Sequence, residues 1–424
     1  MKWMREIHSA IRMVTMRLST LAYVLPLSTI SVFVAVACGS SDNDDTVSNS
    51  NVSTVDGSLN STEEAGADGS TSTTGDGSTA NLDSGGPPTG DPSDPDGFST
   101  DSGVCTNSPA GVTYTETATL TGGKAYKVSY QVGGQERLAQ VCIPNGAGPH
   151  PILVVNHGGF EGLQNELTDR PYCNIALAKG YIAVEAQYRG ETDNGFGTSS
   201  GSIEFCNGEA TDIIELLKIA RNRCDADPKR VSAIGFSHGG CNTLQIASRG
   251  VKLKALIDYF GPTHAATLYD YHNSNRNTGS DAEKTAHNQL ADSIPIWAGG
   301  TPNSNPQAYV DRSPALRAQY FATIPSLIIH GTVDYVVPHS QSCLLHDNLV
   351  SAGATFTNIH INTLFQPITD QVPGCANATY VSSIPSDWAG NHYFVIFDGQ
   401  GHAFDTAHVA ATLDPINKFL DAHM

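Results

Sequence analysis

Residues 104–424 of this chain predict an α/β fold with a mostly parallel central sheet and helices on both faces. Short apolar runs recur along this region, and segments between them have helical spacing. Runs that are apolar throughout are typical of strands buried on both faces, and strands that alternate with helices form parallel sheets. One run leads into G-x-S-x-G at 235–239, a motif that needs a strand before it and a helix after it.

The first 38 residues have the pattern of an export signal. A basic start precedes an apolar run at 19–37, which contains Pro26 and ends in small residues. Residues 35–40, AVACGS, resemble a bacterial lipobox, in which the cysteine is lipidated and becomes the mature N-terminus. The resemblance implies an exported protein held at the outer membrane or cell surface by a lipid on Cys38. Plain secretion, with cleavage near Ala37, is the alternative.

Residues 39–103 consist almost entirely of Ser, Thr, Gly, Asp, Asn and Pro. They include 13 acidic residues and no Lys or Arg. Such a segment cannot bury enough apolar surface to offset its chain entropy, so we expect a disordered tether. The organisation is then a signal at 1–38, a tether at 39–103 and one catalytic domain at 104–424.

The charge of the chain excludes one class of partner. The net charge is −19, and residues 104–424 hold 19 basic and 28 acidic residues without a basic run. Nucleic-acid binding requires basic surface that neutralises phosphates, so we expect no nucleic-acid partner.

Nine cysteines occur, and eight remain if the lipobox cysteine carries lipid. An even number in an exported chain permits four disulfides. Proximity in sequence suggests Cys343 with Cys375 and Cys105 with Cys142. Cys241 follows the G-x-S-x-G motif and is expected in the core, where it could also stay free. No C-x-x-C pair occurs, so we expect no zinc site.

The domain opens with an antiparallel segment and continues with parallel strands. Residues 113–141 alternate as strands do, and two Gly-Gly pairs mark turns, so two or three antiparallel strands are predicted. Helices are predicted at 171–179, which Gly180 ends, and at 209–223. The apolar runs that predict the remaining strands are 151–156, 181–186, 231–236, 254–260, 326–330 and 393–397.

Ser237 is the candidate nucleophile. It lies between an apolar strand and a helix, and Gly235 and Gly239 flank it where a Cβ would collide with neighbouring backbone. The motif also occurs at 197–201, around Ser199, but no apolar strand precedes that copy and no helix follows it. We interpret the second copy as a Gly/Ser-rich loop.

Two later strands end in residues that complete a catalytic triad. Asp334 follows the strand at 326–330, and His402 follows the strand at 393–397. Chemistry in parallel sheets gathers at the carboxyl ends of strands, and the chain order Ser, Asp, His is that of the α/β-hydrolase fold. His402 would take the proton of Ser237, and Asp334 would orient the imidazole. Asp258 and Asp398 are alternative acids.

The oxyanion of an acyl-transfer reaction needs two fixed N–H donors. The fold supplies one from the residue after the nucleophile, here His238, and one from the loop after the strand at 151–156. In that loop Gly159 is the preferred candidate and Phe160 the alternative, because paired glycines allow a close approach of the backbone.

The chain resembles the prolyl oligopeptidase and dienelactone hydrolase branch of the α/β-hydrolases over roughly residues 150–420. The similarity lies in the segments 157–159, 188–190, 225–240, 326–338 and 401–404. The resemblance implies a Ser/Asp/His hydrolase with no metal and no organic cofactor. About forty residues separate the tether from the first core strand, too few for the β-propeller typical of prolyl oligopeptidases, since one blade takes roughly 40–50.

Two long segments are expected to wall the substrate pocket. The first, 262–323, contains Trp297, Tyr269 and Tyr271, and the second, between Asp334 and His402, contains Cys375 and Trp388. We therefore expect a serine hydrolase that cleaves small carboxylic esters through an acyl-enzyme. The alternatives are a propeller-less peptidase for short peptides and a non-catalytic surface binding module on the same fold.

Overall fold

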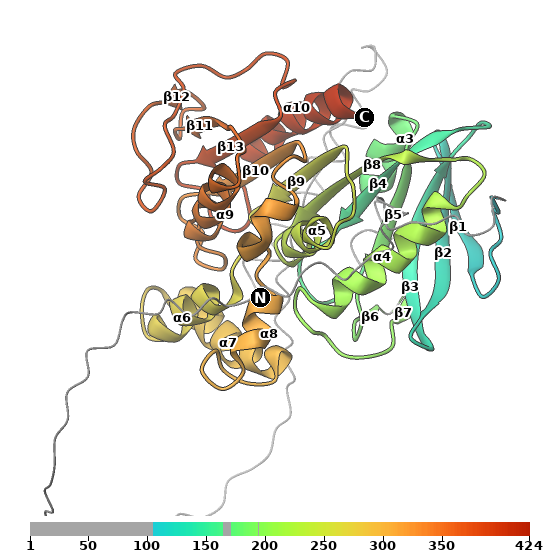
Figure 1. The fold of residues 1–424 in the computed structure, drawn as a ribbon, viewed down its shortest axis with the longest axis horizontal. Helices are drawn as coiled ribbons and strands as arrows, with labels where there is room; N and C mark the ends of the chain where they lie inside the picture. Colours follow the sequence, from blue (N-terminus) through green and yellow to red (C-terminus); the bar gives the residue numbers. More distant parts are fainter. Residues whose placement is uncertain (1–104, 164–170, 194) are drawn as a thin grey trace, which may run out of the picture.

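A computed structural model describes residues 105–163, 171–193 and 195–424 (Figure 1). The expected export signal, tether and lipidation site at Cys38 lie outside these residues. Within the described ranges, no helix is long and apolar enough to cross a membrane.

The described residues are built on one 11-stranded sheet. Its order is β1-β2-β3-β5-β4-β8-β9-β10-β13-β11-β12, antiparallel from β1 to β5, parallel from β5 to β11, and antiparallel at β12. The strands are β1 (Thr113–Leu120), β2 (Gly123–Val132), β3 (Gln135–Pro144), β4 (His150–Asn156), β5 (Ile182–Gln187), β8 (Ala226–Phe236), β9 (Ala255–Tyr259), β10 (Ser326–Gly331), β11 (Thr357–Ile361), β12 (Pro367–Ile368) and β13 (His392–Phe397). A separate pair consists of β6 (Thr192–Asp193) and β7 (Gly197–Thr198).

Helices cover both faces of the sheet, which confirms the predicted fold class. They are α3 (Pro171–Ala178), α4 (Gly208–Arg221), α5 (His238–Ser248), α6 (Ala265–Ser274), α7 (Asp281–Ala298), α8 (Pro306–Asp311), the 3₁₀ helix η1 (Pro314–Tyr320), α9 (Ser340–Ser351) and α10 (Thr406–His423).

The two faces follow from side-chain alternation along each strand. In β4, Ile152 and Val154 share a buried cluster with Leu217 of α4, while Leu153 and Val155 share another with Phe419 of α10. Helices α4, α5 and α9 thus cover one face, and α3 and α10 cover the other. This double burial explains why the core strands are apolar throughout.

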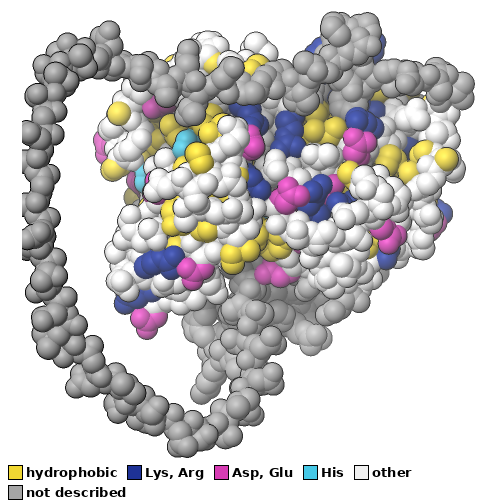
Figure 2. All heavy atoms as spheres, turned by 60° about the horizontal axis from the view of Figure 1, so that its bottom comes forward, with side chains coloured by type: hydrophobic (Ala, Val, Ile, Leu, Met, Phe, Trp, Pro, Cys, Tyr) yellow, Lys and Arg dark blue, Asp and Glu magenta, His cyan; other side chains and the backbone are white. Residues whose placement is uncertain are grey.

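Helices α6, α7 and α8 form the insertion predicted at 262–323. They follow β9 and lie together at one end of the sheet (Figure 1). On the face drawn in Figure 2, acidic and basic side chains lie interspersed among apolar ones. Because β9 is a parallel strand, its carboxyl end places the insertion at the edge where the predicted catalytic residues gather.

The disulfides confirm one expected pair and correct another. Cys343 is bonded to Cys375 as expected, but the pairing of Cys105 with Cys142 is wrong. The backbone of Thr106 donates to the carbonyl of Asn222, which places the first cysteine beside the segment after α4. The four bridges are Cys105–Cys224, Cys142–Cys173, Cys206–Cys241 and Cys343–Cys375.

Candidate active site

Ser237 lies in a sharp turn between β8 and α5. Its backbone has φ 52° and ψ −122°, a conformation that L residues rarely adopt. A Cβ at Gly235 would lie 2.1 Å from the carbonyl oxygen of Gly239, and one at Gly239 would lie 2.0 Å from that of Asn156. Both glycines are therefore required, and the turn presents the serine at the carboxyl end of β8.

The structure brings Ser237, His402 and Asp334 together from three strand ends. His402 Nε2 lies 2.7 Å from Ser237 Oγ, and His402 Nδ1 lies 2.8 Å from Asp334 Oδ2. All three side chains are largely buried, and the ring of Phe260 packs on the imidazole at a centroid distance of 4.7 Å. This arrangement can pass a proton from the serine hydroxyl to the imidazole.

Asp334 is held as a carboxylate by its surroundings. Oδ1 accepts from the N–H groups of Val336 and Val337, each at 2.9 Å, and Oδ2 also lies 3.3 Å from His330 Nε2. Burial by itself raises the pKa of Asp334, but the neighbouring His402 and His330 outweigh it and hold that pKa below its ordinary value. An ionised carboxylate can orient His402 and stabilise its protonated form.

The two alternative acids have other partners. Asp398 Oδ1 lies 2.8 Å from His360 Nε2. Asp258 is fully buried, accepts from the N–H of Gly261 at 3.1 Å, and has its pKa raised to about 7 by burial. Of the three acids, Asp334 is the one that hydrogen-bonds His402.

The candidate oxyanion donors lie beside the nucleophile. His238 is the first residue of α5, where backbone N–H groups point out of the helix. A Cβ at Gly158 would lie 3.2 Å from Ser237 Cβ, so the loop after β4 runs close to the nucleophile. The N–H of Phe160 lies 3.4 Å from Glu161 Oε2, and this contact favours Gly159 over Phe160 as the second donor.

Aromatic side chains pack next to the oxyanion loop. The ring centroid of Phe160 lies 4.7 Å from the ring centroids of both His238 and Trp297. Phe205 stacks on Trp297 at a centroid distance of 5.2 Å. Trp297 of α7 thus packs beside the oxyanion loop. Trp388 does not: it is buried on the far face and packs on Tyr393 at 4.9 Å, because its segment returns along the sheet toward β13.

The other aromatic residues predicted to line the site pack within the insertion. The ring centroid of Tyr269 lies 6.1 Å from that of Tyr309 in α8, and the ring centroid of Tyr271 lies 5.3 Å from that of His287 in α7. Their main contribution is to join α6 to its neighbours. Trp297 of the insertion contacts the oxyanion loop through Phe160.

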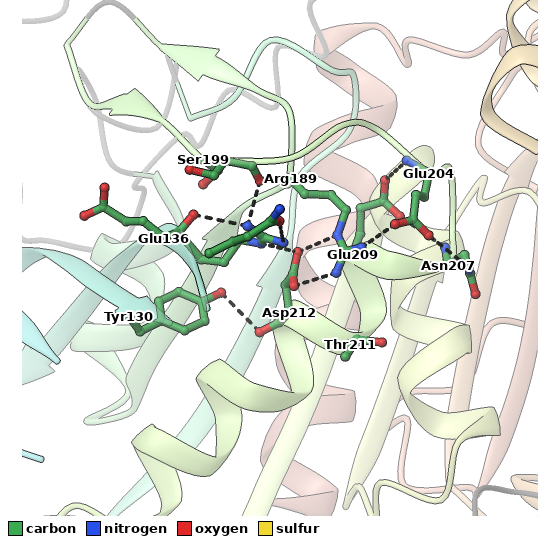
Figure 3. Close-up of polar contacts among 12 residues, drawn as sticks. Tyr130, Glu136, Arg189, Ser199, Glu204, Asn207, Glu209, Thr211 and Asp212 are labelled. Carbon is green, nitrogen blue, oxygen red and sulfur yellow. Dashed lines mark hydrogen bonds and ion pairs between the residues drawn. The ribbon is translucent and has the colours of Figure 1, made fainter. Parts of the chain in front are cut away.

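The loop before α4, which carries Phe205, is fixed by a buried carboxylate. Glu209 accepts from the N–H groups of Glu204 at 2.6 Å, Phe205 at 3.0 Å and Asn207 at 3.1 Å (Figure 3). Phe205 and Cys206 both have positive φ, 49° and 61°, which is uncommon for residues with a side chain. The sequence did not predict this role for Glu209.

A second buried group of charges joins this loop to the sheet. Asp212 of α4 binds Arg189 through both carboxylate oxygens at 2.8 Å and Arg137 of β3 at 2.7 Å, while Arg189 also pairs with Glu204 (Figure 3). Buried charges persist where partners and hydrogen bonds compensate their desolvation. Arg189 belongs to the segment 188–190, in which the chain resembles the hydrolase family. Through Asp212 and Glu204 it holds the loop before α4 in place.

Ser199 of the second G-x-S-x-G copy has a structural role. It is fully buried after β7, its hydroxyl donates to the carbonyl of Gln187 at 2.8 Å, and it accepts from the N–H of Leu138 at 3.0 Å.

Within the described ranges, no group of three or more His, Cys, Asp or Glu side chains could hold a metal ion.

A Ser-His-Asp arrangement at the carboxyl edge of a mostly parallel sheet, in the chain order Ser, Asp, His, defines the α/β-hydrolase class. Residues 171–364 match the sequence profile of the prolyl oligopeptidase family. The described residues therefore have the α/β-hydrolase fold. No curated protein sequence matches the chain.

Solved structures with this fold include peptidases and an esterase. A Bacteroides ovatus protein classed as a dipeptidyl aminopeptidase IV has 15% identity and a TM-score of 0.50, over 72% of this chain and 36% of that one. The acylaminoacyl peptidase of Pyrococcus horikoshii has 16% identity and a TM-score of 0.48, over 72% of this chain and 42% of that one. An acetyl xylan esterase from a Paenibacillus species has 16% identity and a TM-score of 0.49, over 75% of this chain and 90% of that one. The chain thus spans less than half the length of these two peptidases.

Proposed function

We propose that the domain at 104–424 hydrolyses carboxylic esters through an acyl-enzyme on Ser237. The observation that carries this proposal is the 2.7 Å distance from Ser237 Oγ to His402 Nε2, with Asp334 on the other imidazole nitrogen. A nucleophile within hydrogen-bond reach of an oriented base is the signature of covalent catalysis.

The reaction follows from the positions of these groups. Ser237 Oγ attacks the carbonyl carbon while His402 takes its proton, and the oxyanion is stabilised by the N–H groups of His238 and Gly159. The imidazolium then protonates the departing alkoxide, and the acyl group stays on the serine. Water attacks this acyl-enzyme with His402 again as the base, which releases the acid and regenerates the serine.

The surroundings of the oxyanion loop favour an ester over a peptide. Phe160, Phe205 and Trp297 pack there, and these side chains suit an apolar acyl or alkoxy group. The family match supports a second candidate, a peptidase without a propeller that acts on short peptides.

Labelling of the purified protein with a fluorophosphonate, followed by peptide mapping, tests the proposal. We expect the adduct on Ser237, and faster turnover of short p-nitrophenyl esters than of aminoacyl p-nitroanilides. An adduct with preferred cleavage of the anilides would establish the peptidase. Failure of the folded protein to label or to cleave either substrate would indicate the non-catalytic binding module.

We also propose that the protein is exported and held at a membrane by a lipid on Cys38. The four disulfides support an oxidising compartment. Cys38→Ser should move the protein from the membrane fraction to the soluble fraction with its hydrolytic activity intact. A variant that still sediments with membranes would contradict the anchor and leave the enzyme activity unaffected.

A further inference from the structure

The side chain of His238 connects the two backbone segments of the candidate oxyanion hole. Its imidazole is 2% exposed, and Nδ1 lies 3.3 Å from the carbonyl oxygen of Gly159. Nε2 accepts from the N–H of Cys206 at 3.3 Å. The centroid of the ring lies 4.7 Å from that of Phe160 and 5.4 Å from that of Phe205.

These contacts determine where the imidazole proton lies. The backbone N–H of Cys206 can only donate, so Nε2 must be the unprotonated, accepting nitrogen. Nδ1 then carries the hydrogen and donates to Gly159. Burial lowers the pKa of His238 to about 4, so the neutral form with this tautomer persists at neutral pH.

The carbonyl that His238 binds belongs to a residue with little restraint of its own. Gly159 has φ 75° and follows Gly158, and glycine pairs move over a wide range of backbone conformations. A hydrogen bond to the Gly159 carbonyl restricts ψ of that residue and thereby the course of the loop whose N–H would face the oxyanion. A donor displaced by about 1 Å can cost about two orders of magnitude in rate.

We propose that the imidazole of His238 is a positioning residue that holds the Gly159 loop in the conformation that binds the oxyanion. The inference rests on the proposed function, because the same residue supplies the first donor through its backbone N–H. The side chain adds a second contribution, since it aligns the other donor without touching the substrate.

Three substitutions separate the two hydrogen bonds of the imidazole. His238→Phe keeps an aromatic ring but removes both. The amide nitrogen of His238→Asn lies near the place of Nδ1 and can still donate to Gly159. The amide oxygen of His238→Gln reaches the place of Nε2 and can accept from Cys206, but it leaves the Gly159 carbonyl without its donor.

Steady-state hydrolysis of p-nitrophenyl acetate by the full chain tests the proposal. We expect kcat to fall about 10- to 100-fold in His238→Phe, with KM changed by less than about threefold. His238→Asn should recover most of this loss, and His238→Gln should resemble His238→Phe. Thermal unfolding of each variant reports whether the fold is intact.

Two results would overturn the proposal: wild-type kcat in His238→Phe, or equal kcat in the Asn and Gln variants. If His238→Phe does not fold, the comparison of Asn with Gln decides. Wild-type protein that neither reacts with a fluorophosphonate nor cleaves the ester would overturn the proposed function and this inference together. Active wild-type protein with insensitive variants would overturn this inference alone.

Discussion

Asp398 Oδ1 lies at a hydrogen-bond distance of 2.8 Å from His360 Nε2, although Asp398 lies at the end of the same strand that precedes His402. Its partner comes from β11, the neighbouring strand, whereas His402 binds Asp334 from β10. Two acids at neighbouring strand ends thus have separate histidine partners. Substitution of each acid in turn can therefore test which of the two supports His402.

Asp334→Asn should lower kcat by about 10⁴-fold, because an amide cannot stabilise the imidazolium and favours the wrong tautomer of His402. Asp398→Asn should leave kcat near wild type and lower the free energy of unfolding by about 1 kcal/mol. Ester hydrolysis and urea unfolding of both variants measure this. Equal losses of kcat would show that the acid has been assigned to the wrong residue.

Ser199→Ala is the matched control for Ser237→Ala. The first should keep near wild-type turnover but lose about 1–3 kcal/mol of stability, because the N–H of Leu138 would be left without its partner. The second should lower kcat by about 10⁶-fold while the fold is retained. Turnover and thermal unfolding of the two variants distinguish them. Loss of turnover in Ser199→Ala at intact stability would show that Ser237 has been assigned wrongly as the nucleophile.

The pH dependence of stability should reflect His157, which precedes the oxyanion loop. Burial lowers its pKa, but the ion pair with Glu191 at 3.4 Å outweighs burial and raises that pKa to about 9. The folded state therefore binds this proton more tightly than the unfolded state, whose histidine pKa is about 6.5. This contribution to stability is complete below pH 6.5 and is lost as the pH rises through 9.

Glu191→Gln isolates that effect, since it removes the charge but keeps an oxygen that can accept from the N–H of Tyr188. Denaturant unfolding of wild type and variant between pH 6 and about 9.5 provides the measurement. We expect the wild type to lose more stability across this range than the variant. Parallel curves would show that this ion pair does not set the pKa of His157.

The disulfide Cys206–Cys241 should matter for turnover as well as for stability. It joins residues 35 apart, and Cys343–Cys375 joins residues 32 apart, so removing either should cost a similar free energy of unfolding, about 4 kcal/mol. The first anchors the loop that carries Phe205 to the helix of the nucleophile. Double Cys→Ser variants should therefore lower kcat for the first bridge and leave it near wild type for the second. Equal kcat in the two variants would contradict this.

Sequence patterns predicted the core strands because these are buried on both faces and so are continuously apolar. The strand β11, Thr357–Ile361, was missed for the opposite reason. Two of its buried residues are polar: Asn358 donates to the carbonyl of Thr379, and His360 binds Asp398. These partners lie far away in the sequence, so no local pattern marks the strand.

The three residues of the proposed triad could be selected from the sequence because each of them follows a recognisable strand. The contacts that support this site could not be predicted from the sequence. The sequence marked only the backbone of His238, and it gave no reason to join Cys206 to Cys241 or Glu209 to the loop before it. These pairings depend on how α4 and α5 lie against each other, which follows from tertiary packing and not from residue spacing.

Strand β13 lies between β10 and β11 in the sheet, although β11 is synthesised earlier. The edge of the sheet can therefore close only after the last strand has inserted, and that strand carries His402 at its end. A growing or partly folded chain already contains its serine and its acid but lacks an aligned base. The proposed triad is therefore aligned only when this last strand has joined the sheet.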